Sequence, residues 1–411
     1  MTSYTTIECC RVSKEKDLVD ILHLGDQKLT GFFPRPEDEV GVGPLGLVWS
    51  PSSYLVQLKH TYDLKEMYGD NYGYLSSLNN SMVQHLNQKA EYLSEVADLQ
   101  DGDVVVDIGS NDGTFLKALP TYTKRIGIDP TIKKFGGYYP EEIFKVAEFF
   151  SRESYLSVEP QKNAKLVTSI SCFYDLPDPV SFVKDIRDIL TEDGVWHFEQ
   201  AYLPSTLRAN SYDTICHEHL EYYSMLSVMK ILDLAGMRMI DVSLNDINGG
   251  SFAVTACKDT NKDFSVNSVV IDWLINQEYK MGLDTVDPYI NWAKRVDTHR
   301  DSLVNLIRNL RKDGKSVYGY GASTKGNVLL QWCNLSSDDI TAFGEINPDK
   351  YGCITPGSNI PIIPETEVRE AKPDYMIVLP WHFRHGILQR EKEYRNAGGK
   401  FIFPLPYIEI V

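Results

Sequence analysis

The sequence predicts an α/β protein in which a small, irregular, β-rich unit precedes two Rossmann-like, doubly wound units. Three observations predict this fold class. From Asp101 onward, continuous apolar runs alternate with helical stretches, as buried parallel strands joined by helices do. A long helical stretch separates two such series. With 411 residues, the chain also exceeds what one hydrophobic core normally organises.

The N-terminal part consists of short apolar pieces broken by Gly and Pro, such as GFFPRPEDEVGVGPLGLVWSPSSYLVQL. This pattern predicts a strand-rich domain over residues 1–62. The next segment, SMVQHLNQKAEYLSEVADL, has apolar residues at helical spacing. It is therefore expected to form an amphipathic helix.

The first α/β series has four apolar runs that read as strands: DVVVDIG, RIGIDP, KLVTSIS and GVWHFEQ. A helical segment, PVSFVKDIRDILTEDG, lies before the fourth. Together with the preceding helix, this series is assigned to residues 63–262. A domain over residues 263–411 begins with the long helical stretch and continues with the strands SVYGYGAS, ITAFGEI, YMIVLP and KFIFPLP.

The net charge of the chain limits its possible binding partners, and its cysteine content indicates its cellular compartment. A formal net charge of −16 argues against a protein that coats nucleic acid or an anionic membrane. Seven scattered cysteines without a CxxC pair make a disulfide framework improbable, and neither a signal peptide nor a membrane span is recognisable. We expect a cytoplasmic protein, a monomer or homodimer, with no nucleic-acid or membrane partner.

The turn after the first strand of the α/β series is expected to bind the cofactor. In VVVDIGSNDGTFLKAL, the glycines allow backbone to approach a ligand closely, and the pattern is not the GxGxxG fingerprint of dinucleotide binding. Acidic residues suit a ligand with a cationic amino-acid end, and an acid after the second strand suits ribose hydroxyls. The turn fits S-adenosylmethionine better than NAD; a generic nucleotide-binding or structural turn is the alternative. The expected cofactor-binding residues are Asp107, Gly109, Asn111, Asp112, Gly113, Asp129 and, beside the adenine, Phe149.

A second cluster of polar residues, YDTICHEHLEYYS, is the candidate for acid–base chemistry. It is not an HExxH zinc site, because Glu221 stands where the second histidine would be. His217 and His219 are two residues apart and would point to opposite faces of a strand. A histidine near neutral pKa is a suitable general base. A structural cluster with a buried, hydrogen-bonded histidine is the alternative.

Two glycine-rich segments of the C-terminal half are candidates for an anionic substrate. GYGASTKGN follows a strand and opens a helix, so helix N–H groups and Lys325 could meet a diphosphate. The segment lacks the Walker pattern, which excludes an NTPase site. NGGSF is another place where backbone can approach a ligand, and LPWHFRHG is a cationic group that contacts phosphate or forms a solvated loop.

A series of motifs gives the sequence a resemblance over nearly its whole length. They are LGDQKLTGFFP, MYGDNYGYLSSLNNSM, DIGSNDGTFL, FYDLPDP, YDTICHEHLEYYS, NGGSF, GYGASTKGN, EINPDKYG, PGSNIPIIPE and AGGKFIFPLP. In this order they resemble the nucleotide-deoxysugar C-methyltransferases. The resemblance implies an N-terminal zinc-binding domain, a central methyltransferase domain that uses S-adenosylmethionine, and a C-terminal Rossmann-like domain that helps to hold the nucleotide sugar.

The sequence departs from this family at the zinc site. The family's CxxC pairs align with Cys10 and Ser13, and with Ser50 and Ser53, so a single thiolate remains. One thiolate and three hydroxyls do not make the soft tetrahedral ligand set that zinc prefers. We therefore expect no metal, and an N-terminal domain held together by its apolar residues. Nothing in the spacing of His23 and His60 indicates that they replace the missing ligands.

The resemblance also assigns roles around the HEH segment. It implies that His219 removes a proton next to a keto group, and that Glu218 orients this histidine or contacts the sugar. Cys216 stands where some relatives have an assisting tyrosine, and Tyr74 is expected to supply a phenol instead; packing at a domain interface is the alternative for the tyrosines. The remaining residues expected near the substrate are Tyr72, His217, Tyr222, Asn248, Gly249, Lys325 and Tyr320.

Methyl transfer to carbon needs a carbanion, and a neighbouring ketone makes the proton removable by forming an enolate. The expected function is therefore C-methylation, at C-3, of a 4-keto-6-deoxysugar linked to dTDP or GDP. The alternatives are methylation at C-5, an O- or N-methyltransferase acting on a similar sugar, and a non-catalytic protein that binds the nucleotide sugar. A dehydrogenase with two Rossmann domains is disfavoured by Asn111 and Asp112 in the first turn.

Overall fold

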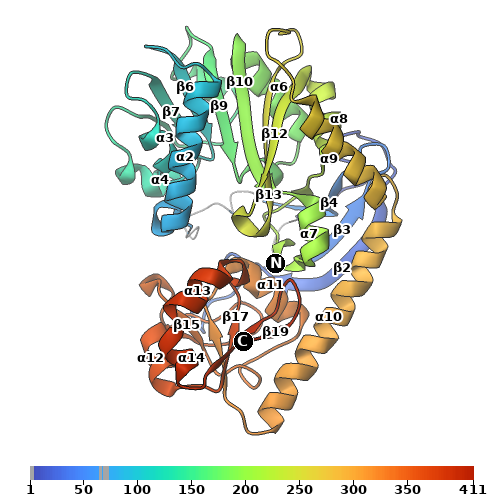
Figure 1. Ribbon diagram of the computed structural model, residues 1–411, viewed down its shortest axis with the longest axis vertical. Helices are drawn as coiled ribbons and strands as arrows, with labels where there is room; N and C mark the ends of the chain where they lie inside the picture. Colours follow the sequence, from blue (N-terminus) through green and yellow to red (C-terminus); the bar gives the residue numbers. More distant parts are fainter. Residues whose placement is uncertain (1–3, 64–66, 68–73) are drawn as a thin grey trace.

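The computed structural model describes residues 4–63, 67 and 74–411. Their strands form four sheets, two of which are the large sheets of two α/β units placed one above the other (Figure 1). The smaller sheets belong to the N-terminal part, which runs along both units. The predicted α/β class and the β-rich N-terminal unit are therefore confirmed.

The central unit contains a seven-stranded sheet in which β13 runs in the opposite direction to the other six strands. The four predicted strands are all present, and every residue of β6 is buried, as expected for a parallel strand covered on both faces. In sheet order the strands are β12 (Met237–Asn245), β13 (Ser251–Lys258), β10 (Leu190–Ala201), β9 (Ala164–Ile170), β6 (Val104–Ile108), β7 (Lys124–Ile128) and β8 (Phe144–Val146).

The helices of this unit begin where the sequence provides caps. The side chain of Asn79 accepts a hydrogen bond from the Ser81 N–H at the start of α2, and Asp178 does the same for Ser181 in α6. The predicted amphipathic helix is α2, which buries Met82, Leu86, Ala90 and Leu93. The helices are α2 (Asn80–Val96), α3 (Thr114–Ala118), α4 (Ile132–Phe135), α5 (Arg152–Leu156), α6 (Pro179–Ile189), α7 (Leu203–Ala209), α8 (Met225–Ala235) and α9 (Ser268–Met281).

The C-terminal unit contains a six-stranded sheet, parallel except for β19. From β14 the chain moves outward to β15 and β16, then returns to the other side of β14 for β17 and β18. Crevices for ligands lie where the strand order reverses in this way, here between β14 and β17. The strands are β16 (Ile362–Pro364), β15 (Phe343–Glu345), β14 (Val317–Tyr320), β17 (Tyr375–Val378), β18 (Lys400–Phe403) and β19 (Glu409–Ile410).

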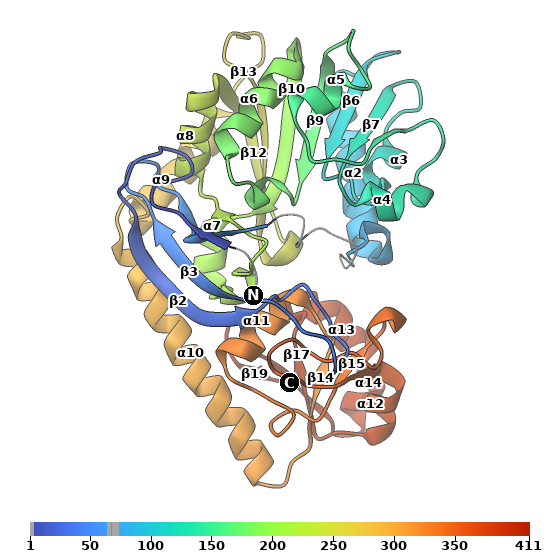
Figure 2. The same cartoon turned by 180° about the vertical axis from the view of Figure 1, so that it is seen from behind.

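The first helix of the C-terminal half is α10, a 26-residue helix that starts beside the N-terminal strands and runs along the C-terminal unit (Figure 2). It buries Trp292, Val296, Leu303 and Ile307 on one face. The helices are α10 (Asp287–Lys312), α11 (Thr324–Trp332), α12 (Glu365–Ala371), α13 (Arg384–Arg390) and α14 (Lys392–Asn396).

The N-terminal strands share a sheet with a strand from the central part of the chain. Strand β11, which directly follows the HEH segment, pairs with β4 and so joins the N-terminal sheet. Its Glu221 forms a buried ion pair with Arg11, at 3.6 Å. The strands are β1 (Tyr4–Thr6) paired with β5 (His60–Tyr62), and the sheet β11 (Glu221–Tyr222), β4 (Val56–Leu58), β3 (Val42–Trp49) and β2 (Val19–Lys28).

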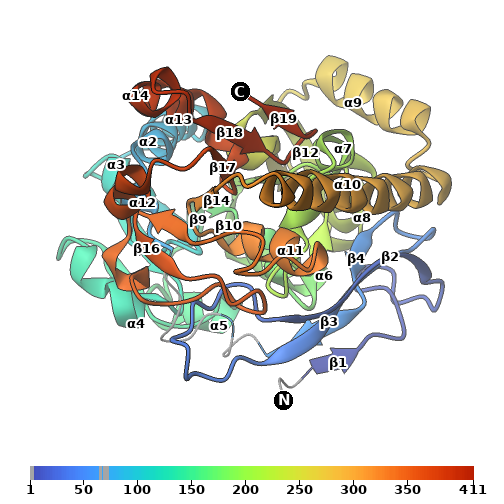
Figure 3. The same cartoon turned by 90° about the horizontal axis from the view of Figure 1, so that it is seen from below.

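Strand β2 also reaches the C-terminal unit, where it passes α11 (Figure 3). The Lys28 backbone N–H donates to Gln331 Oε1 (2.8 Å), and Gln331 Nε2 donates back to the Lys28 carbonyl (3.1 Å). The N-terminal sheet thus contacts both α/β units. Among the described residues, no helix is both long and apolar enough to cross a lipid bilayer.

Candidate active site

A cavity of 390 Å³ opens at the carboxyl ends of β6, β7 and β9, a size within the usual range for small-molecule sites. Five residues predicted to bind the cofactor line it: Asp107, Gly109, Asn111, Asp129 and Phe149. Tyr74, predicted as a catalytic residue, lines it too. Asp112 and Gly113 do not, and Tyr72 lies outside the described residues.

The backbone of the turn requires its glycines. Gly109 has φ +71°, and a side chain there would collide with Cys172. Gly113 has φ +73° immediately before α3, where a side chain would collide with Tyr139. Such left-handed conformations carry little cost only for glycine. Gly109 therefore forms part of the cavity wall, whereas Gly113 adopts the left-handed conformation at the residue that precedes α3.

Asp107 is a buried carboxylate at the carboxyl end of β6. Its Oδ1 accepts a hydrogen bond from Thr168 Oγ1 at 2.6 Å. Burial, opposed by the Thr168 hydrogen bond and reinforced by the charge of Asp129, raises the pKa of Asp107 to about 7. A cationic ligand group in the cavity would stabilise the ionised form of this side chain.

Asp129, after β7, already accepts three hydrogen bonds from the protein. The Asn111 N–H donates to Oδ2 at 2.8 Å, and the N–H and hydroxyl of Thr131 donate to Oδ1 at 2.6 Å each. A carboxylate has about four acceptor sites, so one is left for a ribose hydroxyl.

Asn111 and Asp112 hold the segment that precedes α2 against the cavity. Asn111 Nδ2 donates to the Tyr74 carbonyl (3.0 Å), while its Oδ1 accepts from the Ser76 N–H (3.1 Å). Asp112 accepts from the Ser77 N–H (3.0 Å) and from the Thr114 hydroxyl (2.6 Å). Asp112 therefore departs from the prediction: its carboxylate faces α3 and this segment, not the ligand space.

The HEH segment is a turn, so the strand considered from the sequence is wrong. The His219 N–H donates to the Cys216 carbonyl at 3.2 Å, and no strand includes either histidine. The two rings still point to different neighbours. His217 is fully buried, with Nε2 3.3 Å from the Gly43 carbonyl and its ring edge-on to Tyr62 of the N-terminal part.

His219 is held as a neutral imidazole in which one ring nitrogen remains unprotonated. Nδ1 is 2.8 Å from the Thr214 carbonyl, so this nitrogen carries the proton and Nε2 keeps its lone pair. Burial and the charge of Lys325 lower the pKa of His219 to about 4, which is below the near-neutral value expected from the sequence for a general base. The ring lies edge-on to Tyr174, with centroids 4.5 Å apart, and Asp175 next to this tyrosine lines the cofactor cavity.

The neighbours of His219 are largely enclosed. Burial raises the pKa of Glu218 and that of the Cys216 thiol beside it. The Glu218 carboxylate lies directly against Gly31, where a methyl group would collide with it. Tyr222 is buried, and its hydroxyl is 3.5 Å from the same Thr214 carbonyl that binds His219. Cys216 is too buried to contact a ligand directly, at 1% exposed.

The reversal point of the C-terminal sheet faces this segment. Trp381, after β17, donates its indole N–H to the buried Asp213, three residues before Cys216, at 2.8 Å. Gly249 of the predicted NGGSF turn lies against the same indole, and Asn248 is left-handed, with φ 54°. The charge of Lys325 acts on both Asp213 and His219. The predicted residues Asn248, Gly249, Lys325 and His219 are therefore gathered at one boundary between the two α/β units.

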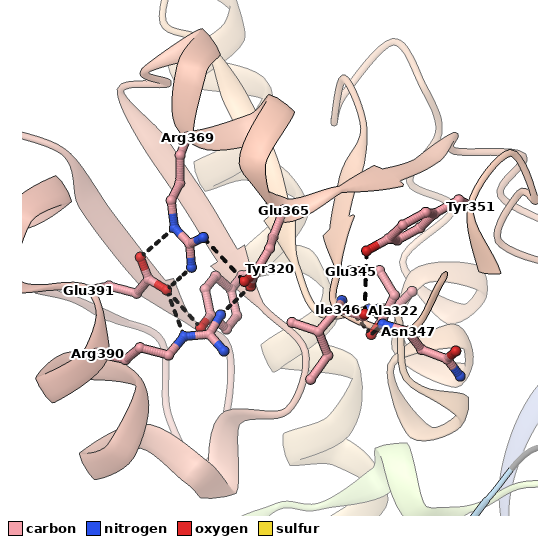
Figure 4. A network of polar contacts seen from close by, with 10 residues as sticks. All are labelled: Tyr320, Ala322, Glu345, Ile346, Asn347, Tyr351, Glu365, Arg369, Arg390 and Glu391. Carbon is pink, nitrogen blue, oxygen red and sulfur yellow. Dashed lines mark hydrogen bonds and ion pairs between the residues drawn. The ribbon is translucent and has the colours of Figure 1, made fainter. Parts of the chain in front are cut away.

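Tyr320 does not belong to this group, because its hydroxyl forms a hydrogen bond within the C-terminal unit (Figure 4). It donates to Glu391 Oε1 at 3.1 Å, and Glu391 also accepts from Arg369 and Arg390. Tyr320 was expected near the substrate, and a substrate contact by its hydroxyl would have to replace this hydrogen bond.

Glu345, at the end of β15, occupies the place where dinucleotide-binding folds keep an acid for ribose (Figure 4). Its two oxygens accept backbone N–H groups of Ala322 (3.0 Å), Ile346 (2.8 Å) and Asn347 (3.0 Å). Three acceptor sites of this carboxylate are therefore used by backbone N–H groups and one is left, as at Asp129.

The four positions aligned with zinc ligands come together, but as a hydrogen-bonded cluster. Cys10 Sγ lies 3.0 Å from Ser53 Oγ, and Ser52 Oγ donates to Ser13 Oγ (2.7 Å). Ser50 donates to Asp17 Oδ1 (2.8 Å), and the Ser52 N–H donates to its Oδ2 (2.9 Å). Within residues 4–63, 67 and 74–411, no three His, Cys, Asp or Glu residues are grouped as metal ligands. The donor set does not fit zinc.

Sequence reasoning missed several residues of this region. Tyr174 and Asp175 belong to FYDLPDP, and their position after a predicted strand was a usable signal. Ser171 and Cys172 line the cavity from the same turn. Nothing in the sequence indicated that Asp213 and Trp381 would meet, because 168 residues separate them.

Three family models match consecutive parts of the chain. They are described as a putative zinc binding domain (residues 10–68), a methyltransferase domain (82–242) and a C-methyltransferase C-terminal domain (246–406). A curated relative, C-methyltransferase NovU of Streptomyces niveus, is 32% identical over 410 residues, covering 98% of this chain and 97% of the relative.

Solved structures resemble part of the chain. A methyltransferase in complex with the Haloferax volcanii Trm112 activator has a TM-score of 0.35 and 14% identity, covering 44% of this chain and 94% of its own. An S-adenosylmethionine-dependent methyltransferase of Clostridium acetobutylicum has a TM-score of 0.35 and 12% identity, covering 43% and 92%.

Proposed function

Since the chain belongs to the C-methyltransferase family and is an S-adenosylmethionine-dependent enzyme, we propose that its acceptor is a nucleotide-linked 4-keto-6-deoxysugar. The nucleotide is dTDP or GDP, and the carbon that receives the methyl group is C-3. We place the reaction in the cytoplasm, in agreement with the seven free cysteines.

The observation that supports this acceptor is the meeting of the two α/β units at Asp213 and Trp381. On one side lie His219 and the cofactor cavity, and on the other lies the reversal point of the second sheet, where ligand crevices form. An acceptor with two distinct ends matches this arrangement. Its anionic nucleotide would lie in the C-terminal unit, and its reacting sugar next to His219.

In this proposal His219 is the general base. The Thr214 carbonyl fixes the proton on Nδ1, so Nε2 can take a proton from the carbon next to the ketone. Lys325 carries a positive charge close to this imidazole. It would favour the neutral histidine and contribute to holding the anionic acceptor. The bound cofactor supplies the electrophilic methyl group, and Tyr74 and Phe149 border its cavity.

Glu218 is assigned to the sugar or to the orientation of His219. One oxygen of this carboxylate, Oε2, is buried without a hydrogen bond to the described residues. A buried polar atom without a partner costs free energy unless a ligand satisfies it. Burial raises the pKa of Glu218, which would let a protonated Glu218 donate a hydrogen bond to a sugar oxygen.

The test is proton exchange in deuterated water, followed by mass spectrometry. The protein is given a dTDP- or GDP-4-keto-6-deoxysugar without and with S-adenosylmethionine. We expect deuterium uptake next to the ketone without the cofactor, and a gain of one methyl group with it. Both signals should be lost in His219→Ala and retained in His23→Ala, a control histidine on the exposed face of β2.

Other outcomes separate the alternatives. Methylation without exchange and without dependence on His219 would indicate an oxygen or nitrogen acceptor. Exchange and methylation located at C-5 by NMR would keep the mechanism and correct the position. Cofactor binding with neither signal on either nucleotide would refute the proposed acceptor class.

A further inference from the structure

A buried carboxylate at the carboxyl end of β10 links several structures around the cofactor cavity. Glu199 lies two residues before the end of this strand, and its side chain is 1% exposed. His85 Nε2 lies 2.5 Å from Oε1, while Lys89 Nζ (2.9 Å) and Asn245 Nδ2 (3.0 Å) contact Oε2. Three donors from two separate segments therefore converge on one carboxylate.

The first segment is the cavity wall formed by α2. His85 and Lys89 are four residues apart, so they lie on one face of this helix. Met82 and Leu86 of the same helix line the cofactor cavity. Because α2 is tied to β10 through the carboxylate, the position of these two apolar side chains depends on Glu199.

The second segment is the turn on the acceptor side. Asn245 donates to Glu199 with its Nδ2, and its Oδ1 accepts from the Ile247 N–H at 3.0 Å. This turn continues to Gly249, which lies against Trp381. The main chain of Glu199 adds a third link, since its carbonyl accepts from the N–H of Ser171, a cavity residue, at 2.7 Å.

Maximal stability does not explain an ionised group at this place. Burial disfavours the charge, yet His85 and Lys89 lower the pKa of Glu199 to about 2. Replacing a buried ion pair by apolar residues is often neutral or stabilising, whereas a converging set of donors fixes one geometry. An apolar contact would hold α2 on the sheet without fixing its register relative to Asn245.

We propose that Glu199 is a positioning residue, whose side chain sets α2 and the Asn245–Gly250 turn in the arrangement that binds the cofactor and borders the acceptor. Glu199 touches neither of them and acts through His85, Lys89 and Asn245. The part of this inference that concerns the acceptor turn rests on the proposed function; the part that concerns the cofactor does not.

The experiment compares Glu199→Gln with Glu278→Gln. Glu278 is a matched control, because it is fully buried and accepts hydrogen bonds from Tyr202, Met225 and Leu226 without lining the cavity. S-adenosylhomocysteine binding is measured by calorimetry on the full-length protein. Loss of one charged hydrogen-bond network should weaken binding about tenfold in Glu199→Gln, and less than about twofold in Glu278→Gln.

Unchanged affinity of Glu199→Gln for S-adenosylhomocysteine would overturn the proposal. Equal weakening in Glu199→Gln and Glu278→Gln would also overturn it, because it would mean a general loss of packing.

If Glu199→Gln does not fold, the partly exposed His85 provides the test. His85→Ala should weaken binding about fivefold, and His85→Gln, which keeps a donor, should recover most of it; equal weakening in both would also contradict the proposal.

Kinetics add a readout that a purely structural role does not move. For Glu199→Gln we expect KM for S-adenosylmethionine to rise about tenfold while kcat at saturation changes less than about threefold. A fall confined to kcat would overturn the positioning role. The calorimetric result needs no acceptor, so it stands even if the proposed acceptor is wrong.

Discussion

At the residue scale, burial sets the charge of the two groups on which cofactor binding and proton transfer depend. Asp107 is raised to a pKa of about 7, and His219 is lowered to a pKa of about 4. One group is therefore partly protonated at neutral pH, and the other is neutral. A cationic ligand group beside Asp107 would stabilise its ionised form, and the neutral His219 keeps one unprotonated ring nitrogen.

Cofactor affinity should depend on pH through Asp107. Its raised pKa means that the free protein binds a proton there below pH 7, and a cationic ammonium group favours the ionised form. Binding then releases a proton, so affinity for S-adenosylhomocysteine should rise up to about tenfold per pH unit between pH 5 and 7 and level off above. Calorimetry across this range measures the dependence.

The control for this prediction is Asp107→Asn, which cannot release a proton. This variant should bind more weakly at pH 8, and its affinity should be nearly independent of pH. Equal affinity of the unmodified protein at pH 5.5 and pH 8 would contradict the coupling.

Gly31 is a second residue whose substitution is informative, because a Cβ there collides with the Glu218 carboxylate. Overpacking of this kind costs about 1–3 kcal/mol. Gly31→Ala should lower kcat/KM for the acceptor about tenfold or more and leave S-adenosylhomocysteine affinity unchanged. Gly137→Ala, at a position with open space around it, is the matched control; equal kcat/KM in both variants would contradict the assignment of Glu218.

The sequence was sufficient to select many of these residues as site candidates, but it did not predict which other residues would surround them. Residue types and the order of motifs suffice to select Asp107 and the HEH segment. The choice of His219 over His217 depended on the family resemblance, and the structure gives a physical basis for it: His217 is enclosed by Gly43 and Tyr62. Such surroundings depend on contacts between segments far apart in the sequence.

At the scale of elements, the N-terminal cluster shows how a turn is held by hydroxyls and one carboxylate. Asp17 accepts from Ser50 and from the Ser52 backbone, and both contacts favour the ionised form, so the pKa of Asp17 is lowered although burial opposes this. The sequence predicted a metal-free unit held by apolar residues alone. Asp17 and its hydrogen bonds were not foreseen, because they depend on the folded path of both turns.

Removal of metal ions should therefore leave the stability of this chain unchanged. Dialysis against a chelator, or addition of zinc, should leave the thermal midpoint unchanged, whereas Asp17→Asn should cost about 1 kcal/mol in the free energy of unfolding. The contribution of Asp17 is present above its unfolded pKa and is lost as the pH falls through the lowered one.

A positive control shows that the assay detects zinc. The triple variant Ser13→Cys, Ser50→Cys and Ser53→Cys restores four thiols at the clustered positions, and should bind one zinc ion and unfold at a higher temperature with it. A chelator-sensitive midpoint in the unmodified protein would contradict the prediction.

Secondary structure was predictable where the pattern is periodic. The strands that end in DIG and in SIS, and the helices α2 and α6, agree with their apolar patterns. The HEH segment, by contrast, is short and polar, and its turn is imposed by the flanking contacts of Thr214 and β11. The hairpin of β12 and β13 was not predicted, although its two strands are consecutive in the sequence.

At the scale of the whole molecule, the alignment of the two α/β units depends on contacts that cross between them. Trp381 and Asp213 form one, and Tyr212, His299 and the Pro404 carbonyl form another, with distances of 3.0 and 2.5 Å. The order of the units could be read from the sequence. Their mutual placement could not, since it depends on pairs of residues far apart in the chain.

Trp381→Phe tests this placement. It leaves the buried Asp213 carboxylate without its indole donor, a loss worth about 2 kcal/mol, so kcat/KM for the acceptor should fall about thirtyfold. S-adenosylhomocysteine affinity should not change, because the cofactor cavity lies in the central unit. The half-exposed Trp273 on α9 provides the control, Trp273→Phe; a parallel loss there, or a loss of cofactor affinity in Trp381→Phe, would refute the assignment.

The pairing of β11 with β4 limits which segments of the chain can be exchanged between relatives by recombination. The residues that follow the HEH turn are an edge strand of a sheet whose other members are encoded more than 150 positions earlier. A gene fusion that exchanged only the methyltransferase segment would separate this strand from its partner and leave Glu221 without Arg11. New acceptor preferences should therefore arise by point substitution within the crevice, and chimaeras should fold only when the first sixty residues and the HEH segment are inherited from the same parent.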